Sequence, residues 1–578
     1  MIDFQVEIQK IISGDVDTSP ATLDTYSTDW SLFSVRPQVV VFPKTASDIE
    51  QLVQWVATHK HDYPELSLTV RAAGTGMSGG SLNTSIIVDV NRYMQGVIDI
   101  DVDDFGMQTS QAGYDFDIVG HARVLPGTFY RDFEKQTHDL ELELPCYPAS
   151  KSICAVGGMV ANNGAGEKSL KYGQNKDFVH KLKAVLSDGN EYTIKPLTYS
   201  ELQDKRVERG FEGTLYDSIY ALIKDNEDMI NRARPTTSKN AAGYLLWEVL
   251  QSPSIAQFEM GMGYFDLTKL FVGAQGTTGI ITEIEYKLIH VESESDLLVV
   301  FVNDLADVPA LVSELMKSDL EMLEVYDDNT FKLGVKFFRQ FIRDKGFWGA
   351  LKYGVRFIPD MWKVITGGVP KLVVLAEFVS SDIDGLYTEV IEADERVKAL
   401  GLKTLQALKK KQEEKYWDFR HDSFKLLTEH TMATRSSGQG TRTAPFIDDI
   451  AVNPEHFPEF LPRLVSILDK YELTKTIAGH LGNGNLHIIP LMDMNISENK
   501  AKILDASAEV YNLVLEFGGT ITAEHNDGII RTPYLAQMYG NEVVALFQKV
   551  KDIFDPKNIF NPGKKVGGTF DDIKKYLA

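Results

Sequence analysis

The chain has 578 residues, and its 43% hydrophobic and 24% charged content is typical of a soluble globular protein. This length predicts more than one domain, and the formal net charge of −23 argues against nucleic acid as a partner, because phosphate binding needs basic surface. Two cysteines, Cys146 and Cys154, exclude a disulfide scaffold and a cysteine-bound iron–sulfur centre.

The first half of the chain alternates short strands with helices and glycine-rich turns. Residues 1–35 are expected to form a helix and a connector, and residues 36–292 an α+β domain. Its early elements are a strand at 39–43, a helix at 47–59, strands at 67–72 and 85–90, and a hairpin at 183–194.

Residues 293–578 predict a second α+β domain with a different texture. The predicted strands are 297–302 and 371–379, and the predicted helices lie near 307–317, 384–400, 408–428 and 498–517. Two further strands flank a short turn near residues 477–489.

An insertion near 332–371 departs from the acidic character of the chain. It carries nine basic residues, interleaved with phenylalanines and tryptophans, against the acids Asp344 and Asp360. Basic aromatic helices are typical of segments that lie on an anionic membrane surface. Docking of a membrane or an electron acceptor is therefore one interpretation, and a helical excursion with inward-packed aromatics is the other.

Residues 71–81 read RAAGTGMSGGS and contain a G-x-G-x-x-G pattern. A strand follows this loop, whereas the dinucleotide fingerprint requires a helix, so the Rossmann interpretation fails. Consecutive amides in such a loop still form an anion-binding nest. Two more glycine-rich stretches, 154–179 and 270–289, predict an extended cofactor lying along backbone.

The motifs RAAGTGMSGG, VGGMVANNGAG and VGAQGTTGIIT resemble the PCMH-type FAD-binding domain of the vanillyl-alcohol-oxidase superfamily. The C-terminal half resembles the FAD-linked oxidase C-terminal domain of D-lactate and D-2-hydroxyglutarate dehydrogenases. The resemblance covers about residues 36–565 and is weakest at 330–370. It implies an α+β fold with an FAD domain at 36–292 and a substrate and metal domain at 293–578.

The resemblance also implies which residues bind FAD. They are Ala73, Gly74, Thr75, Gly76, Met77 and Ser78 around the pyrophosphate, then Gly157, Gly158, Ala161, Asn162 and Gly164, then Gly279 and Ile281, and finally Asn561. Covalent relatives carry a flavin-linking histidine in the first loop. Because residues 71–81 contain no histidine, and Thr75 stands near that position, we expect non-covalent FAD.

A histidine cluster is predicted near the C-terminus. His480 and His487 flank an LGNGN turn, and TAEHND supplies Glu524 and His525. Two histidines and a carboxylate form a common ligand set for a divalent ion with an open position. The resemblance assigns metal binding to His480, His487 and Glu524. It assigns proton transfer to His525. Two histidines and one glutamate suit zinc, which we expect first, and also manganese, iron or cobalt.

Two arginines match family motifs for the substrate carboxylate, Arg420 in YWDFR and Arg442 in GTRTAPFIDDIAV. A surface ion pair is the alternative for each. Asp448 and Asp449 are expected to be structural. Asn526 and Asp527 replace the family's usual residues after His525, and an added acid there is expected to raise the pKa of His525 and alter substrate preference.

The expected reaction is oxidation of a D-2-hydroxy acid, D-lactate or D-2-hydroxyglutarate, with a hydride passing to flavin N5 and electrons to a quinone or redox protein. The alternatives are an alcohol or polyol oxidase that uses O2 and an electron-transfer flavoprotein subunit.

With no signal-peptide core and no apolar run of ~20 residues, we expect a cytoplasmic protein. Peripheral contact with the inner membrane and a homodimer stay open.

Overall fold

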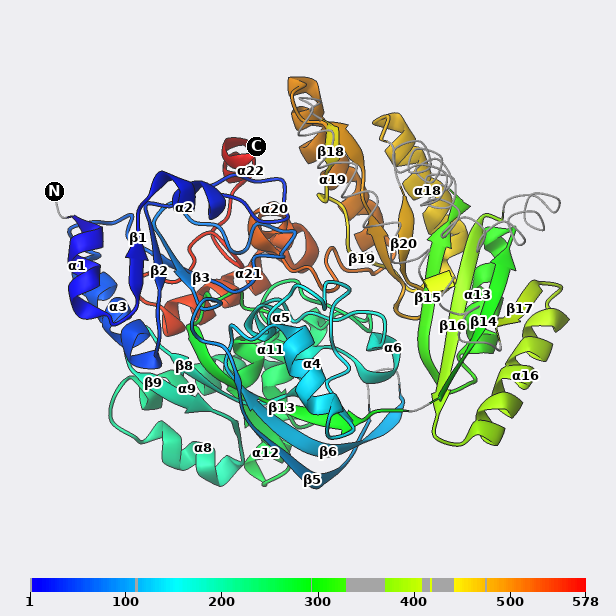
Figure 1. The fold of residues 1–578 in the computed structure, drawn as a ribbon, viewed down its shortest axis with the longest axis horizontal. Coiled ribbons are helices and arrows are strands. Elements are labelled where there is room, and N and C mark those ends of the chain that lie inside the picture. Colours follow the sequence, from blue (N-terminus) through cyan, green and yellow to red (C-terminus); the bar gives the residue numbers. More distant parts are fainter. Residues whose placement is uncertain are drawn as a thin grey trace.

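The computed structural model describes residues 3–109, 113–292, 294–328, 370–407, 416–417, 441–473 and 476–578. The three largest of its sheets position the candidate site, from the blue N-terminal sheet to the green and orange one at the right of Figure 1. Arg420, the helix predicted at 408–428 and the insertion up to residue 369 fall outside the described residues. Of Arg442, only its backbone position in a strand is described.

The first sheet has four strands and carries the first glycine-rich loop. Its spatial order is β1 (Asp15–Asp17), β2 (Val39–Phe42), β4 (Ile86–Asp89) and β3 (Leu68–Arg71). Strands β3 and β4 are parallel, so the loop between them crosses over without a helix, as the strand–loop–strand pattern predicts. Helix α3 (Ala46–His59) buries its apolar face against this sheet.

The N-terminal residues add an edge strand to this sheet, which the sequence did not indicate. Helix α1 (Phe4–Ile11) is followed by β1, which pairs antiparallel with β2. Three residues are too few to show the period-two alternation by which strands are recognised. The segment at 1–35 is therefore more than a helix and a connector.

The second sheet has six strands and supports the other two glycine-rich loops. Its order is β5 (Val97–Thr109), β6 (Asp115–Val124), β13 (Ile280–His290), β8 (Val179–Val185) and β9 (Glu191–Ile194), with β7 (Leu142–Glu143) also paired to β13. All of these pairings are antiparallel. The loop before β13 is held against helix α5 (Val156–Asn162) by the N–H groups of Gly273 and Gln275, which donate to the carbonyls of Val160 and Ala161. The hairpin predicted at 183–194 is confirmed by β8 and β9.

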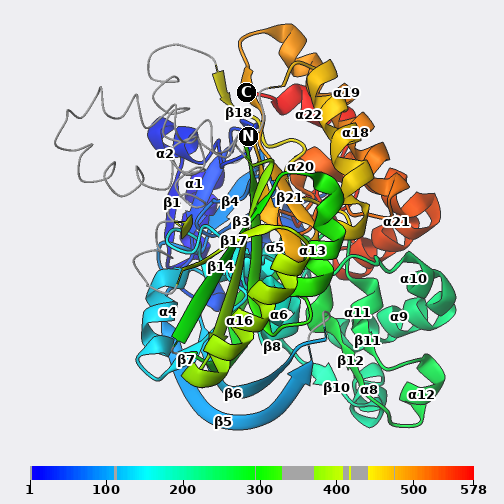
Figure 2. The same ribbon diagram turned by 90° about the vertical axis from the view of Figure 1, so that its right-hand side faces the viewer.

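The third sheet has seven strands and presents the histidines. Its order is β17 (Lys403–Ala407), β14 (Glu294–Val302), β16 (Leu372–Ser380), β15 (Leu320–Asp327), β20 (Ile477–His480), β21 (Asn485–Ile488) and β19 (Ile450–Ala451). Helices α13 (Val308–Leu315) and α16 (Ile383–Ala399) lie along it in Figure 2. With α18 (Phe457–Lys470) and α19 (Ser497–Glu516), they bury an extensive apolar core.

The C-terminal chain returns to the first half of the protein. Helix α21 (Leu535–Phe554) packs against α9 (Phe211–Asp225) and α10 (Glu227–Ala233), beside which it lies in Figure 2. Its apolar side chains belong to the core of the second sheet. This return brings Asn561 and the residues after His525 beside the glycine-rich loops.

Candidate active site

The first glycine-rich loop offers an unpaired row of backbone amides. Among the described residues, none accepts a hydrogen bond from the backbone N–H groups of residues 73–78. Residues 73–77 are half-buried, so these amides are open to a ligand. Gly74 has φ +69°, the left-handed conformation that glycine adopts at little cost. A row of amides of this kind suits a pyrophosphate.

Helix α5 presents small residues to the same space. Gly157, Gly158, Ala161 and Asn162 are half-buried, whereas the other residues of the helix are buried. A Cβ on Gly158 would meet only the Cβ of Ala72, at 3.7 Å. The loop and the helix face each other across a space lined by backbone and small side chains. These predicted residues therefore fit an extended flavin.

Three other residues predicted to bind the flavin are buried or half-buried within the protein. Gly164 is buried and its N–H donates to the carbonyl of Met159. Gly279 is buried, and a Cβ there would lie 3.0 Å from the Val185 carbonyl oxygen. Ile281 lies half-buried in β13. Contact of these three residues with FAD stays a prediction.

Asn561 ties two of the loops together. Its side chain accepts a hydrogen bond from Thr69 Oγ1 at 2.7 Å. It donates to the carbonyls of Gly80 and Gln275 at 2.8 and 2.6 Å. Because its side chain is fully engaged, Asn561 holds the first and third loops in register.

Replacing Gly158 with valine should weaken FAD binding by about tenfold or more, the effect of a clash of 1–2 kcal/mol. The Cβ itself finds only ordinary contact, but the added methyl groups enter the space between α5 and the first loop. The ratio of flavin to protein absorbance after gel filtration measures the effect. Gly158→Ala is the matched control and should retain FAD; full retention by the valine variant would contradict this placement.

The residues after His525 touch all three glycine-rich loops. Asn526 Nδ2 donates to the carbonyls of Asn162 and Gly273, at 3.1 and 2.8 Å. The N–H of Gly528 donates to Gln275 Oε1 at 2.8 Å. The N–H of Ile529 donates to the Ser78 carbonyl at 2.8 Å. The histidine cluster therefore lies directly against the proposed flavin cradle.

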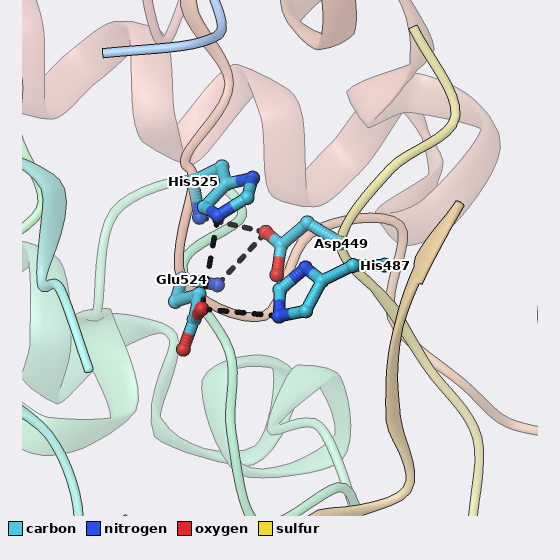
Figure 3. Close-up of side chains that lie close together, drawn as sticks. All are labelled: Asp449, His487, Glu524 and His525. Carbon is cyan, nitrogen blue, oxygen red and sulfur yellow. Dashed lines mark hydrogen bonds and ion pairs between the residues drawn. The ribbon is translucent and has the colours of Figure 1, made fainter. Parts of the chain in front are cut away.

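The cluster itself converges on one carboxylate oxygen. Glu524 Oε1 lies 3.5, 3.4 and 3.7 Å from the Nε2 atoms of His480, His487 and His525. The turn between β20 and β21 brings the first two imidazoles to one end of the sheet, with ring centroids 5.2 Å apart, as the sequence predicted. Figure 3 shows His487, Glu524 and His525 turned toward one another.

The tightest group of ligand atoms differs from the predicted metal ligands. Asp449, His487, Glu524 and His525 each place one such atom within 4.8 Å of the others, and His480 is outside this group. Asp449 Oδ2, however, already accepts hydrogen bonds from the N–H groups of Glu524 and His525 and from Thr522 Oγ1. Asp449 thus fixes the loop that carries the cluster, in agreement with its predicted structural role.

Two acidic residues contact the Nδ1 atoms of His480 and His525 and orient these two imidazoles. His480 Nδ1 lies 2.5 Å from Glu324 Oε1, and His525 Nδ1 lies 2.6 Å from Asp448 Oδ2. Asp448 also pairs with the buried Arg531, at 2.6 Å. Carboxylates of this kind hold one ring nitrogen and aim the other. Glu324, Arg531 and the contact of Asp448 with His525 were not among the features predicted from the sequence.

Glu524 and His487 are held in the protonation states of metal ligands, whereas at His480 the carboxylates of Glu324 and Glu524 outweigh burial and raise the pKa. Burial opposes ionisation of Glu524, but Lys239 and His480 outweigh it and hold the pKa of that carboxyl well below its usual range. Burial lowers the pKa of His487 and so keeps this imidazole neutral, as a metal ligand must be. An ionised carboxylate beside imidazole nitrogens is a donor set that fits a divalent metal.

His525 has a different electrostatic environment. Burial disfavours its charged form, but the carboxylates of Asp449 and Asp448 outweigh burial and raise the pKa of His525 to about 9. Asp527, expected to be the acid that raises it, instead lies 2.6 Å from Lys565 and accepts the N–H of Gly243. The rise in pKa is correct, but its source is the Asp448–Asp449 pair.

Comparisons with known proteins agree with this architecture. Residues 37–195 match the family described as FAD binding domain, and residues 292–565 match the FAD linked oxidases, C-terminal domain. At 14% identity, the structure shares its fold with 4-ethylphenol oxidase from Gulosibacter chungangensis, with a TM-score of 0.64 over 98% of this chain and 97% of that chain. p-Cresol methylhydroxylase gives 0.63 over 97% and 96%, also at 14% identity.

The chain combines the FAD binding domain and the C-terminal domain of FAD-linked oxidases, and the predicted α+β fold is confirmed. Within that class it is a relative of 2-hydroxy-acid dehydrogenases. It is 27% identical to the D-2-hydroxyglutarate dehydrogenase of Escherichia coli (strain K12), over 98% of this chain and 52% of that protein. The chain thus spans about half the length of that relative.

Other relatives match along nearly their whole length. Glycolate oxidase subunit GlcD of Bacillus subtilis is 25% identical over 98% of this chain and 97% of that protein. The probable mitochondrial D-lactate dehydrogenase of Danio rerio is 24% identical over 96% and 90%.

Across the part of the chain that the structure describes, no helix has both the length and the apolar character needed to cross a bilayer.

Proposed function

We propose that this protein oxidises a D-2-hydroxy acid, D-lactate or D-2-hydroxyglutarate, to the 2-oxo acid with non-covalent FAD. One observation carries the proposal: residues 525–529 join the histidine cluster to all three glycine-rich loops. A small substrate held at His525 would therefore lie against the flavin cradle. The names of the relatives support the substrate class.

Each residue of the cluster has a role in this proposal. FAD, held by the first loop and α5, supplies the acceptor for the hydride that leaves C2 of the substrate. His525 accepts the hydroxyl proton at Nε2, because Asp448 occupies its Nδ1. His480, His487 and Glu524 would hold a divalent metal, zinc first, which stabilises developing alkoxide charge and lowers the pKa of the nearby imidazole.

The substrate carboxylate needs a planar cation, which arginine provides. Arg420 and Arg442 are proposed for this role by motif, and neither side chain is among those described. Arg442 lies in β18 (Thr441–Thr443), which pairs with β22 (Leu491–Asp493) a few residues after His487.

D-Lactate or D-2-hydroxyglutarate should bleach the flavin rapidly under anaerobic conditions, while the L-enantiomers should leave it oxidised. The enantiomer preference follows the D-2-hydroxy-acid relatives, and the placement of His525 beside the cradle supports reduction of the flavin there. Stopped-flow absorbance with metal analysis of the same sample measures it. A flavin that stays oxidised with every D-2-hydroxy acid would sink the proposal, and stoichiometric peroxide would favour the alcohol-oxidase alternative.

Replacing Asp448 with asparagine should slow flavin reduction by about 10²-fold to 10⁴-fold, since an amide can stabilise the wrong imidazole tautomer. Substrate binding and FAD content should change little, because Asp448 is fully buried and contacts Nδ1 of His525 rather than Nε2. Single-turnover kinetics separate the rate from the affinity. Asp448→Glu keeps the carboxylate and should recover part of the rate; equal rates in the two variants would argue against this role.

Several expectations stay predictions. They are the electron acceptor, quinone or redox protein, peripheral contact with the inner membrane face, a cytoplasmic location and a homodimer.

Glutamate replacements of Lys336, Arg339 and Arg343 should weaken sedimentation with anionic vesicles if the insertion docks on a membrane. These three residues lie outside the described ranges.

A further inference from the structure

A fully buried lysine lies beneath the cluster. Lys239 has no exposed surface, and its Nζ lies 2.9 Å from Glu524 Oε2 and 3.3 Å from Asn485 Oδ1. A buried ammonium group is stable only when it is paired and hydrogen-bonded. The contact with Glu524 is therefore a fixed feature of the site rather than an exchangeable surface pair.

The backbone around Lys239 is anchored on both sides. The N–H of Asn240 donates to Gln174 Oε1 at 3.1 Å, and the N–H of Ala241 donates to the Thr522 carbonyl at 3.0 Å. Asn485, the second partner of Lys239, is held in turn by Asp449 Oδ1 at 3.1 Å. These bonds fix the ammonium group with respect to the loop that carries Glu524.

The two oxygens of Glu524 consequently have different surroundings. Oε2 accepts from Lys239, while Oε1 faces the Nε2 atoms of His480 and His487. A carboxylate binds a metal through one oxygen or through both, and the second mode takes an additional coordination position. A catalytic site of three protein ligands needs an open position for its substrate.

We propose that Lys239 is a positioning residue that holds Oε2 of Glu524, so that Glu524 binds the metal through Oε1 alone and a coordination position is kept for the substrate. This inference rests on the proposed metal ligands His480, His487 and Glu524. It gives a function to a residue that touches neither substrate nor flavin. The segment that carries Lys239 thereby shapes a cluster that is otherwise built from the C-terminal half of the chain.

The test uses cobalt(II) as the probe metal in the FAD-loaded protein. Lys239→Met removes the ammonium group and keeps an unbranched side chain of similar length. We expect cobalt to remain bound, its visible absorption to fall by about twofold or more as a second Glu524 oxygen joins, and oxalate, a mimic of the product's oxygens, to perturb it less. Lys239→Gln provides a second variant should the first one fold poorly.

A matched control is Lys171→Met. Lys171 is also buried and pairs with a carboxylate, Asp319, at 2.8 Å, and none of its described contacts is with Glu524 or the three histidines. Its cobalt spectrum should equal that of the wild type. A wild-type protein that takes up no cobalt would refute the proposed ligands and this inference together. A wild-type spectrum in both Lys239 variants, or loss of cobalt with FAD retained in both, would overturn this inference alone.

Discussion

Replacing His525 with glutamine should reduce the rate of flavin reduction by about 10²-fold to 10⁴-fold, the usual contribution of a positioned general base. Glutamine preserves size and polarity but cannot take the hydroxyl proton. Its neighbours hold the position: Asp448 lies 2.6 Å from Nδ1, and Asp449 accepts the backbone N–H of His525. Anaerobic stopped-flow reduction with the best D-2-hydroxy acid measures the effect.

The pH dependence of flavin reduction provides a second test of the His525→Gln variant. A base acts when it is unprotonated, so the rate should rise with pH up to the pKa of His525 and then level off. The carboxylates of Asp449 and Asp448 place that pKa at about 9 without a metal. A cation on Glu524 should move the plateau to lower pH. In the His525→Gln variant this rising limb should disappear, and its persistence would assign the proton transfer to another group.

Removing the metal should have an effect of similar size. Loss of Lewis-acid stabilisation costs several kcal/mol of barrier, and about 4 kcal/mol corresponds to roughly 10³-fold in rate. Chelator-treated protein should keep FAD, lose flavin reduction and recover with zinc, manganese or cobalt. Glu524→Gln should give the same loss without recovery, because the amide removes the charge at Oε1 that faces the imidazoles.

The controls for metal removal separate binding from catalysis. Flavin absorbance checks that the cradle is intact, and metal analysis checks that the ion has left. Full activity in protein shown to be free of metal would exclude a metal-assisted reaction. It would leave His525 and Asp448, which is paired with Arg531, as the chemical groups of the site. Activity that returns only with one metal would identify the metal.

Local patterns in the sequence predicted much of the fold. The helix at 47–59 and the strands beside the first glycine-rich loop follow from apolar periodicity and are found as α3, β3 and β4. The LGNGN turn predicted a two-strand unit carrying His480 and His487, which the structure confirms. In each case the residues in contact lie close together along the chain.

The missed residues depend on contacts between distant segments. Lys239 meets Glu524 across 285 positions, and Glu324 meets His480 across 156. Strand β15 was also missed, because buried glutamates such as Glu324 interrupt the apolar pattern by which strands are recognised. A buried charge takes its meaning from its partner, and one sequence does not pair them.

The departure at Asn526 and Asp527 has a structural explanation. Asn526 adopts φ +67° and bridges the second and third glycine-rich loops, while Asp527 pairs with Lys565. Both side chains are fully buried and are held by these structural partners. We therefore expect substrate preference to depend on other residues, with Arg420 and Arg442 the first to replace.

The short run of residues from His525 to Ile529 has a thermodynamic consequence. The same few residues form one wall of the flavin cradle and hold the proton-transfer group. A ligand that orders these residues lowers the entropic cost of ordering them for a second ligand. Such coupling between two binding free energies is reciprocal. Loading with flavin should therefore tighten cobalt binding, and cobalt should tighten flavin binding by the same free energy, so that the affinity for each cofactor reports on the other.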